Sequence, residues 1–234
     1  RYMQDYLATV KAVDESVGEV LDYLEENGLS DNTLVVYTSD QGFFLGEHGF
    51  FDKRFMYEES FSTPLLMQYP GKIKPGTVVD ELVQNIDYAP TFLQFAGVDA
   101  PKDLDGESMV DLLTTGQANN WRSSLYYHYY ESPGFHNVAR HYGVRDNRYK
   151  LIHFYYPDDA WELYDLKQDG TEMQNVIDDP AYKNEVVRLK RELHKLEKQY
   201  DVPPMEEWKD MDLVHMPKDR LQDLFPQSFE NGKN

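Results

Sequence analysis

A short apolar run that leads directly into a polar loop most constrains how this chain folds. The run, Leu34-Val35-Val36-Tyr37, is rich in β-branched residues and suits a buried strand. The loop after it, residues 38–54, reads TSDQGFFLGEHGFFDKR and places carboxylate and amide oxygens, a histidine and a lysine among three glycines. In open α/β sheets, ligands bind beyond the carboxyl ends of the strands. The sequence therefore predicts an α/β fold with a ligand site on this loop.

The first half of the chain alternates helical and strand-like patterns. Apolar residues recur at helical spacing over residues 4–27, Gly28 follows as a C-cap, and we expect this apolar stripe to pack into the core. Strands are expected at residues 33–38 and 64–69. A helix from residue 88 to 96 is expected to begin with Asp87 as its N-cap and Pro90 in its first turn. This alternation is typical of an α/β sheet.

The second half is aromatic and strand-like. Three segments, residues 124–130, 139–145 and 149–156, are separated by turn residues and predict an antiparallel meander. A helix over residues 181–199 is expected to pack against the meander through one apolar stripe, and the polar tail from residue 201 onward is expected to be irregular. We place the domain boundary between a unit at 1–115 and a small α+β subdomain at 116–234.

The acidic composition limits the partners. A net charge of −19 argues against nucleic acid or an anionic membrane as the main partner, because both require a basic surface. No apolar run approaches the ~20 residues of a membrane span. One local exception is the stretch 136–153, which carries four basic residues and three histidines against one acid. It is either a solvated face of a hairpin or an anion-binding surface.

Four residues of the loop are candidates for chemistry. Asp40 and Gln41 offer a carboxylate and an amide oxygen, which suit a hard divalent cation such as calcium or magnesium. Lys53 would neutralise a bound anion and the charge that develops on a leaving oxygen. His48 would bind the anion or donate a proton to the leaving group. The alternatives are a turn-capping Asp40, a surface Lys53 and a His48 hydrogen-bonded to backbone.

This loop resembles that of the type I sulfatases of the alkaline phosphatase superfamily. In that family an Asp followed by Asn, His or Gln completes a calcium site and a downstream lysine binds the sulfate, which matches Asp40, Gln41 and Lys53. Further matching segments are Tyr57-Glu58-Glu59-Ser60, Thr63-Pro64-Leu65-Leu66, Tyr69-Pro70-Gly71, Asp87-Tyr88-Ala89-Pro90-Thr91-Phe92, Arg145-x-x-Arg148-Tyr149-Lys150 and Glu162-Leu163-Tyr164-Asp165-Leu166 with Glu172 and Asn175. Ser62 departs from the pattern, because many relatives carry a basic residue there. The resemblance implies that residues 1–115 are the C-terminal part of an alkaline phosphatase-like catalytic domain.

The resemblance also implies a nucleophile that this chain lacks. Family members use a formylglycine made from a Cys/Ser-x-Pro-x-Arg motif, and the chain contains neither a cysteine nor Ser-x-Pro-x-Arg. We therefore expect a C-terminal portion that does not turn over substrate alone. The resemblance implies a periplasmic, extracellular or lysosomal location, and it leaves the oligomeric state open.

The substrate assignment depends on one stretch. Residues 136–143, HNVARHYG, resemble the branch that removes 6-O-sulfate from N-acetylglucosamine in glycosaminoglycan-type chains. This implies a sulfated carbohydrate substrate bound by His136, Arg140 and His141. The alternatives are a phosphodiesterase or phosphonate hydrolase of the same superfamily, and a non-catalytic carbohydrate-binding fragment.

Overall fold

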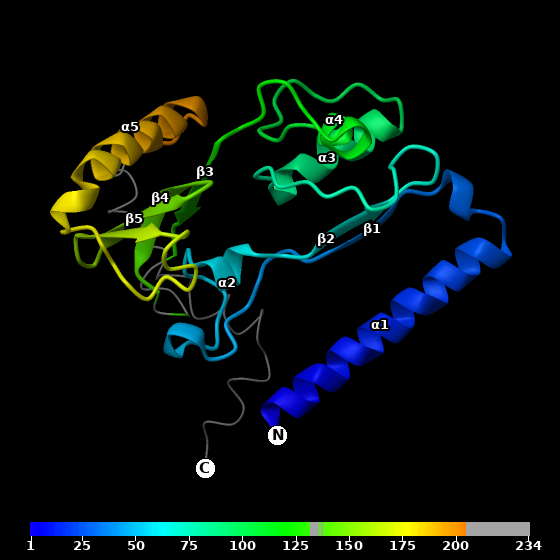
Figure 1. Ribbon diagram of the computed structural model, residues 1–234, viewed down its shortest axis with the longest axis horizontal. Helices are drawn as coiled ribbons and strands as arrows, with labels where there is room; N and C mark the ends of the chain where they lie inside the picture. The colour runs from blue at the N-terminus through cyan, green and yellow to red at the C-terminus, as the bar shows by residue number, and fades with distance from the viewer. Residues whose placement is uncertain (132–135, 137, 205–234) are drawn as a thin grey trace, which may run out of the picture. The chain divides into compact units, whose positions relative to one another are not determined.

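The computed structural model describes residues 1–131, 136 and 138–204 (Figure 1). Its contacts divide the chain into two compact units. The first comprises Arg1–Asp40 and Thr63–Asn120, and the second comprises Gln41–Ser62 and the chain from Trp121 onward. The loop segment 41–62 therefore folds with the second unit, although it follows a strand of the first. The domain boundary between residues 115 and 116 stays a prediction.

The first unit begins with a long helix, α1 (Tyr2–Glu26). Its C-terminus is closed as predicted: Gly28 has a φ of 64°, its N–H donates to Glu25 O, and the N–H of Leu29 donates to Leu24 O. This pair of bonds is a Schellman motif, which needs a left-handed residue that glycine supplies without strain. The expected core packing of the apolar stripe is wrong for the described chain, since no residue of α1 is buried.

Two strands of the first unit form an antiparallel pair. They are β1 (Val35–Thr38) and β2 (Leu65–Gln68), with Val35 opposite Gln68 and Thr38 opposite Leu65. The remaining elements of the unit are η1 (Ser30–Asn32), η3 (Asn85–Asp87), α3 (Tyr88–Phe95) and α4 (Val110–Thr115). Both strands lie within their predicted ranges, and each is shorter than predicted.

Asp87 stands at the N-cap position of α3, as predicted, but its side chain makes no capping hydrogen bond to that helix. Its side chain is fully buried and accepts hydrogen bonds from the N–H groups of Gln84 and Glu107, each at 2.8 Å. It therefore closes the 3₁₀ turn η3 and ties it to the loop before α4. Asp87 is both the last residue of η3 and the residue before α3, and its carboxylate serves the capping box of η3.

The second unit is a four-stranded antiparallel sheet with one packed helix, as predicted for the subdomain. The strands lie in the order β3-β4-β5-β6. Their bounds, with those of the helical elements, are β3 (Ser124–Tyr129), β4 (Arg140–Asp146), β5 (Tyr149–Tyr156), β6 (Ala160–Asp165), η2 (Glu47–Gly49), α2 (Glu58–Phe61), η4 (Pro180–Tyr182) and α5 (Lys183–Gln199). The fourth strand was not predicted. The expected turn at residues 132–134 and most of the expected tail lie outside the described residues.

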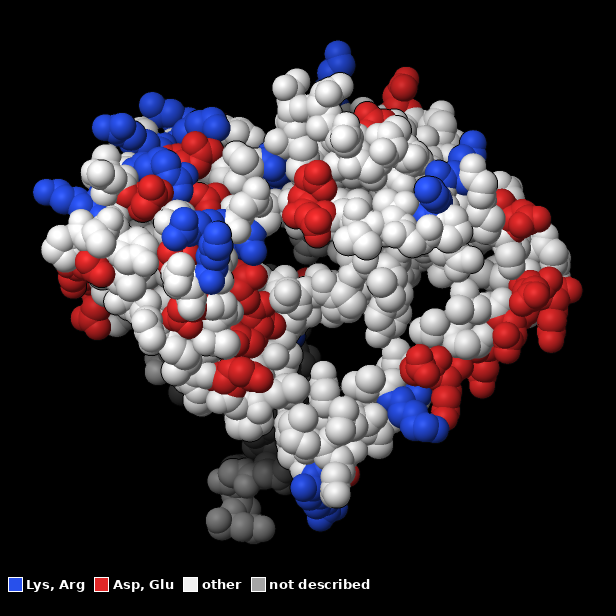
Figure 2. Space-filling model, in the orientation of Figure 1, with Lys and Arg blue, Asp and Glu red and all other residues white. Residues whose placement is uncertain are grey.

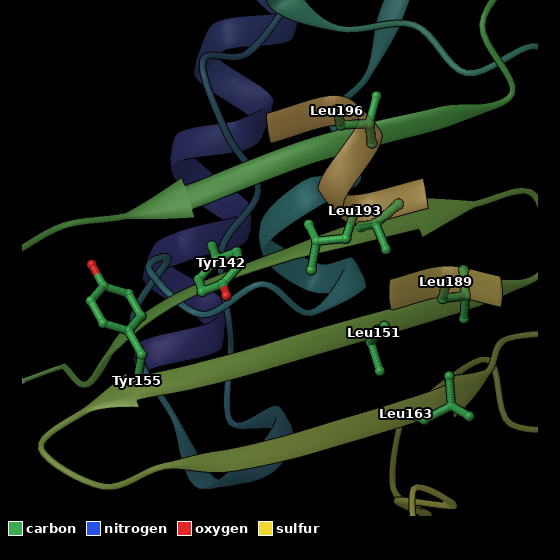
Figure 3. Close-up of a cluster of buried hydrophobic side chains, with 8 residues drawn as sticks. Tyr142, Leu151, Tyr155, Leu163, Leu189, Leu193 and Leu196 are labelled. Atoms are coloured by element: carbon green, nitrogen blue, oxygen red, sulfur yellow. The ribbon is translucent and has the colours of Figure 1, made fainter. Parts of the chain in front are cut away.

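One face of this sheet packs against α5 (Figure 3). Leu189, Leu193 and Leu196 recur at helical spacing and are almost fully buried. They contact the strand residues Tyr142, Val144, Leu151, Tyr155 and Leu163. Burying a leucine side chain contributes about 1.5–3 kcal/mol, so the predicted stripe fixes the helix on the sheet.

The loop segment 41–62 packs on a second cluster of the same unit. Phe44, Met56 and Tyr57 are buried there with Ile152 and Tyr164. Gly143 of β4 permits the close approach, because a Cβ at this position would lie 2.3 Å from Leu151 O and 2.8 Å from Met56 Sδ. The sheet therefore holds α5 and the loop segment through different sets of side chains.

Charge is unevenly spread over the chain. Helix α1 carries seven acidic residues and one lysine, whereas lysine and arginine side chains gather over α5 (Figure 2). No described helix has a stretch long and apolar enough to cross a membrane.

Candidate active site

The predicted ligand loop is closed on itself by three hydrogen bonds. Gly42 N donates to Ser60 O at 2.7 Å, and Phe44 N donates to Asp52 O at 2.7 Å. The hydroxyl of Ser60, on α2, donates to Lys53 O at 2.6 Å. A Cβ on Gly42 would lie 1.9 Å from the backbone oxygen of Glu59, so only glycine fits where these two backbone segments meet. The backbone of Lys53 is thus attached to α2.

The neighbours of Lys53 are engaged in contacts of their own. Its N–H donates to Asp52 Oδ1 at 2.6 Å, and the same carboxylate oxygen pairs with Arg54. The second Arg54 amino group lies 2.7 Å from His136 Nε2, and Tyr127 OH donates to Arg54 O at 3.0 Å. Because a guanidinium only donates, His136 accepts through Nε2. The structure therefore brings His136 to the residue next to Lys53.

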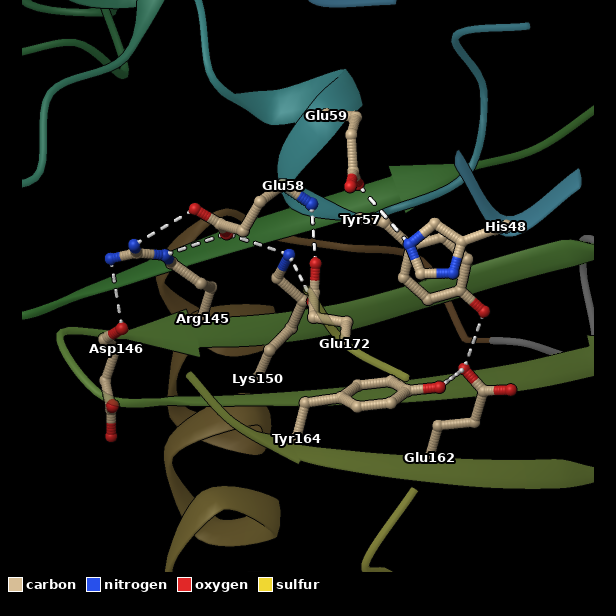
Figure 4. Close-up of polar contacts among 10 residues, drawn as sticks. All are labelled: His48, Tyr57, Glu58, Glu59, Arg145, Asp146, Lys150, Glu162, Tyr164 and Glu172. Carbon is tan, nitrogen blue, oxygen red and sulfur yellow. Dashed lines mark hydrogen bonds and ion pairs between the residues drawn. The ribbon is translucent and has the colours of Figure 1, made fainter. Parts of the chain in front are cut away.

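His48 is held in one orientation on this loop (Figure 4). Its Nε2 lies 3.4 Å from Glu59 Oε2, and its ring stacks on Tyr57 with a centroid distance of 4.4 Å. Only 10% of its side chain is exposed. The backbone of His48 adopts a φ of 54°, which is uncommon for a residue with a Cβ. A proton-donor role for His48 stays a prediction.

The ring under His48 belongs to a tyrosine pair that shares one carboxylate. Tyr57 OH donates to Glu162 Oε2 at 2.9 Å, and Tyr164 OH donates to the same oxygen at 3.0 Å. Burial and the Glu162 charge raise the pKa of Tyr57 far above its usual range. Both hydroxyls therefore act as neutral donors that fix the ring position.

A buried ion cluster supports α2 from the sheet side (Figure 4). Lys150 Nζ lies 2.8 Å from Glu58 Oε1 and 2.7 Å from Glu172 Oε1. The side chains of Lys150 and Glu172 are both 0% exposed. Arg145 Nη2 lies 3.3 Å from Glu58 Oε2, and the N–H of Glu58 donates to Glu172 Oε2 at 2.6 Å. We call Glu58, Arg145, Lys150 and Glu172 the Lys150 cluster.

The two carboxylates of the Lys150 cluster respond differently to their surroundings. Burial would raise the pKa of Glu58, but the adjacent Lys150 and Arg145 cations bring it below its usual value. Burial dominates at Glu172 and raises its pKa, although Lys150 opposes the change. Two acids and two bases give a neutral cluster at full ionisation, which is the arrangement that a buried site tolerates best.

The basic stretch 136–153 is largely neutralised within this chain. Arg145 and Lys150 bind Glu58, and Arg148 Nη2 lies 2.7 Å from Asp165 Oδ2. These three side chains therefore serve the fold of the hairpin and its attachment to α2.

The three predicted sugar-binding residues are not gathered in one place. His141 is fully buried; its Nδ1–H donates to Ala139 O at 2.8 Å, and its ring packs against Phe55 and Phe154. Burial lowers the pKa of His141 to about 4, so it is neutral at pH 7. Arg140 is 2% exposed, and its guanidinium lies 5.0 Å above the ring of Tyr156, in the cluster that packs on α5. His136 alone of the three is exposed.

Asp40 and Gln41 offer oxygen donors for a cation. Asp40 is exposed at the end of the segment after β1, and Ser39 Oγ donates to Asp40 Oδ1 at 3.3 Å. A carboxylate and an amide oxygen fit calcium in chemical kind. Within the described residues, no group of three or more His, Cys, Asp or Glu could hold a metal ion. Asp40 and Gln41 would therefore form only part of a coordination sphere.

Sequence reasoning missed the supporting roles of Arg54, Glu58 and Glu172. For Arg54 the sequence does hold a signal, since this residue directly follows Lys53. The contact between Glu58 and Glu172 spans 114 residues, and no spacing along the chain indicates it.

Comparisons with known proteins place these observations in a family. Residues 46–199 match the family described as "N-sulphoglucosamine sulphohydrolase, C-terminal". An N-acetylglucosamine-6-O-sulfatase of Bacteroides thetaiotaomicron is 52% identical over 202 residues, which cover 86% of this chain and 36% of that protein. The chain therefore spans about a third of the length of this curated relative.

Two solved structures share the fold. One, in complex with its substrate D-glucosamine-2-N,6-O-disulfate, has a TM-score of 0.83 and 52% identity, covering 86% of this chain and 41% of that one. The other, a phosphonate monoester hydrolase from Silicibacter pomeroyi, has a TM-score of 0.71 and 32% identity, covering 80% and 39% respectively.

Proposed function

Because this chain belongs to the sulfatases of the alkaline phosphatase superfamily, we propose that it is part of a sulfuric ester hydrolase that acts on a sulfated carbohydrate. The more specific proposal is a 6-O-sulfated N-acetylglucosamine unit of a glycosaminoglycan-type chain. One observation carries the sugar and the sulfate position: the 52% identity, over 202 residues, to a protein named as an N-acetylglucosamine-6-O-sulfatase.

Lys53 is the proposed sulfate ligand. Its ammonium would neutralise a sulfate oxygen and the negative charge that grows on the leaving oxygen as the sulfur–oxygen bond breaks. Such stabilisation is most effective when the charge is positioned before the reaction. Two hydrogen bonds of the Lys53 backbone support this role: its N–H donates to Asp52 Oδ1 and its carbonyl accepts from the Ser60 hydroxyl, which fixes the point from which the side chain extends.

His48 is the proposed proton donor to the leaving sugar oxygen. The neighbouring Glu59 carboxylate lies 3.4 Å from Nε2 and, with the stacked Tyr57 ring, holds the imidazole in one orientation, as a donor to a fixed leaving group requires. The low exposure of His48 also fits a purely positioning role, and a variant separates the two. His48→Gln should slow esters with poor leaving groups and spare activated aryl sulfates, whereas a positioning residue would affect both alike.

Calcium and the nucleophile complete the proposed site. Asp40 and Gln41 would bind the cation, which would orient the sulfate and withdraw charge from it. The chain contains no cysteine and no Ser-x-Pro-x-Arg, so its own residues do not supply a formylglycine. We infer that the formylglycine belongs to another part of the complete enzyme and that the isolated chain is inactive. A periplasmic, extracellular or lysosomal compartment stays a prediction.

The sugar would be bound beside the sulfate. The exposed His136, in contact with Arg54, supports a role in this binding. Arg140 and His141 are buried, so a direct sugar contact by either would require the strand end to open.

A phosphonate monoester hydrolase is the second candidate, favoured by the structural similarity to such an enzyme. The test compares the complete enzyme on 6-O-sulfated N-acetylglucosamine and on a phenyl phosphonate monoester, with sulfate release measured by ion chromatography. We expect release of sulfate, at least tenfold slower with Lys53→Ala. Faster cleavage of the phosphonate, or unchanged sulfate release with Lys53→Ala, would contradict the proposal.

A further inference from the structure

We propose that Lys150 is a positioning residue for Lys53, acting through Glu58 and Glu172 on the short helix α2. The inference rests on the proposed role of Lys53 in sulfate binding. It assigns a purpose to a buried cation that cannot reach a substrate, since its side chain is 0% exposed.

The first link runs from Lys53 to α2. The carbonyl of Lys53 accepts a hydrogen bond from the Ser60 hydroxyl at 2.6 Å, and Ser60 is itself buried. The backbone oxygen of Ser60 also accepts a hydrogen bond from the N–H of Gly42. Both ends of the ligand loop therefore meet at one residue, and a displacement of Ser60 would displace Lys53.

The second link concerns α2 itself. The helix contains four residues, Glu58–Phe61, and no side chain caps its N-terminus from within the loop. A single helical turn is not stable by itself, because nucleation costs more than its few hydrogen bonds return. Its first N–H, that of Glu58, donates instead to Glu172 Oε2 at 2.6 Å. The position of α2 is therefore set by contacts outside it.

The third link is the attachment of these contacts to the sheet. Lys150 lies within β5, opposite Arg145 on β4 and Tyr164 on β6, so its backbone is paired on both sides. From this position its ammonium reaches Glu58 at 2.8 Å and Glu172 at 2.7 Å. It also lies 4.9 Å from the ring centroid of Phe61, the last residue of α2. Lys150 thus contacts α2 at both ends.

A nearby ion pair provides a matched control. Arg148 lies in the turn between β4 and β5, and Asp165 is the last residue of β6. The two are paired at 2.7 Å, and no described contact joins either residue to the segment 41–62. Arg148→Met removes an arginine–carboxylate pair from the same subdomain without touching the support of α2.

The test is a double-mutant cycle in the complete enzyme, with Lys53→Ala and Lys150→Met alone and together. We expect Lys150→Met to lower kcat at least tenfold on both an aryl sulfate and the sulfated sugar, with KM changed less than threefold. In the Lys53→Ala background, Lys150→Met should cause little further loss, because both changes remove the same contribution. Arg148→Met should keep kcat within twofold.

Each of the following outcomes is decisive. Multiplicative losses in the double variant, or an unchanged kcat in a folded Lys150→Met enzyme, overturn the positioning role. An unaffected Lys53→Ala enzyme overturns the proposed function instead. If Lys150→Met does not fold, Glu172→Gln carries the same cycle, since its amide oxygen still accepts from Glu58 N while the charge is removed; additivity with Lys53→Ala would then overturn the inference.

Discussion

Lys150 and Glu172 form an ion pair of 2.7 Å in which neither side chain is exposed to solvent. The pair joins β5 to a loop residue and, through Glu58, to α2. Removing one partner of a buried pair leaves an uncompensated charge, which costs about 3–5 kcal/mol. We predict that Glu172→Ala lowers the free energy of unfolding by this amount. Urea denaturation of the variant measures it, and a loss below about 1 kcal/mol would mean that the site readily admits water.

Gly143 should not tolerate even an added methyl group. A Cβ would lie 2.3 Å from Leu151 O, a backbone atom that the β4–β5 pairing holds in place. Gly143→Ala is therefore expected to destabilise the protein by about 1–3 kcal/mol or more. Gly18 in α1 is the control, because nothing lies within 4 Å of its Cβ position. Gly18→Ala should raise stability by about 0.5–1 kcal/mol. Thermal melting compares the two.

Stability should fall in mild acid because of His141. Burial depresses the pKa of His141 to about 4 in the folded protein, against 6.5 for an ordinary histidine. As pH falls, His141 is therefore protonated in the unfolded chain at a higher pH than in the folded protein, which favours unfolding. The stabilisation is complete above pH 6.5 and is lost progressively down to about pH 4. His141→Phe should reduce the slope of the unfolding free energy between these pH values, and the slope that remains is expected from His128, whose pKa burial lowers to about 3. An unchanged slope in His141→Phe would contradict the role of His141.

Asp40→Ala should reduce calcium binding and abolish turnover of the complete enzyme, because a hard cation loses an anionic oxygen ligand. Calcium content by atomic emission and sulfate release are the two measurements. Removal of calcium by a chelator should reproduce the loss in the unsubstituted enzyme, and added calcium should restore activity there. Full metal content with full activity in Asp40→Ala would limit this loop to a structural role.

His136 should affect the sugar and not the sulfate. His136→Ala is expected to raise KM for the sulfated sugar at least fivefold and to leave KM for a small aryl sulfate unchanged. The reason is that the variant loses a contact to the sugar that is equally strong in the ground state and in the transition state. Arg140→Ala is the comparison. Arg140 packs on Tyr156, so its loss should lower thermal stability and leave the KM ratio between the two substrates unchanged. Equal changes for both substrates with His136→Ala would remove it from sugar recognition.

Local patterns predicted most elements of the fold. The stripe on α5 and the turn signals at residues 146–147 are short-range features, and the helix and the hairpin follow from them. Strand β6 escaped prediction because its sequence, AWELYD, mixes apolar and acidic residues without a run of β-branched ones. Its place in the sheet depends on pairing with β5.

The candidate site was less predictable, because its support is long-range. Lys150 was grouped with other basic residues by proximity in sequence, yet its partners Glu58 and Glu172 come from distant segments. The grouping of Arg140 with His141 also neglected the alternation of a strand, in which neighbouring side chains point to opposite faces. The structure separates them, toward Tyr156 and toward Phe154, and the β4–β5 register shifts between the two residues.

The path of the backbone makes the two units inseparable by any single cut. The chain leaves the first unit after Asp40, returns at Thr63 and leaves again after Asn120. A truncated protein that starts at Trp121 would keep the four strands and α5 but would lack Phe44, Met56 and Tyr57, and so would uncover Ile152 and Tyr164. Transfer of this subdomain to another protein would therefore require the short segment 41–62 to be transferred with it.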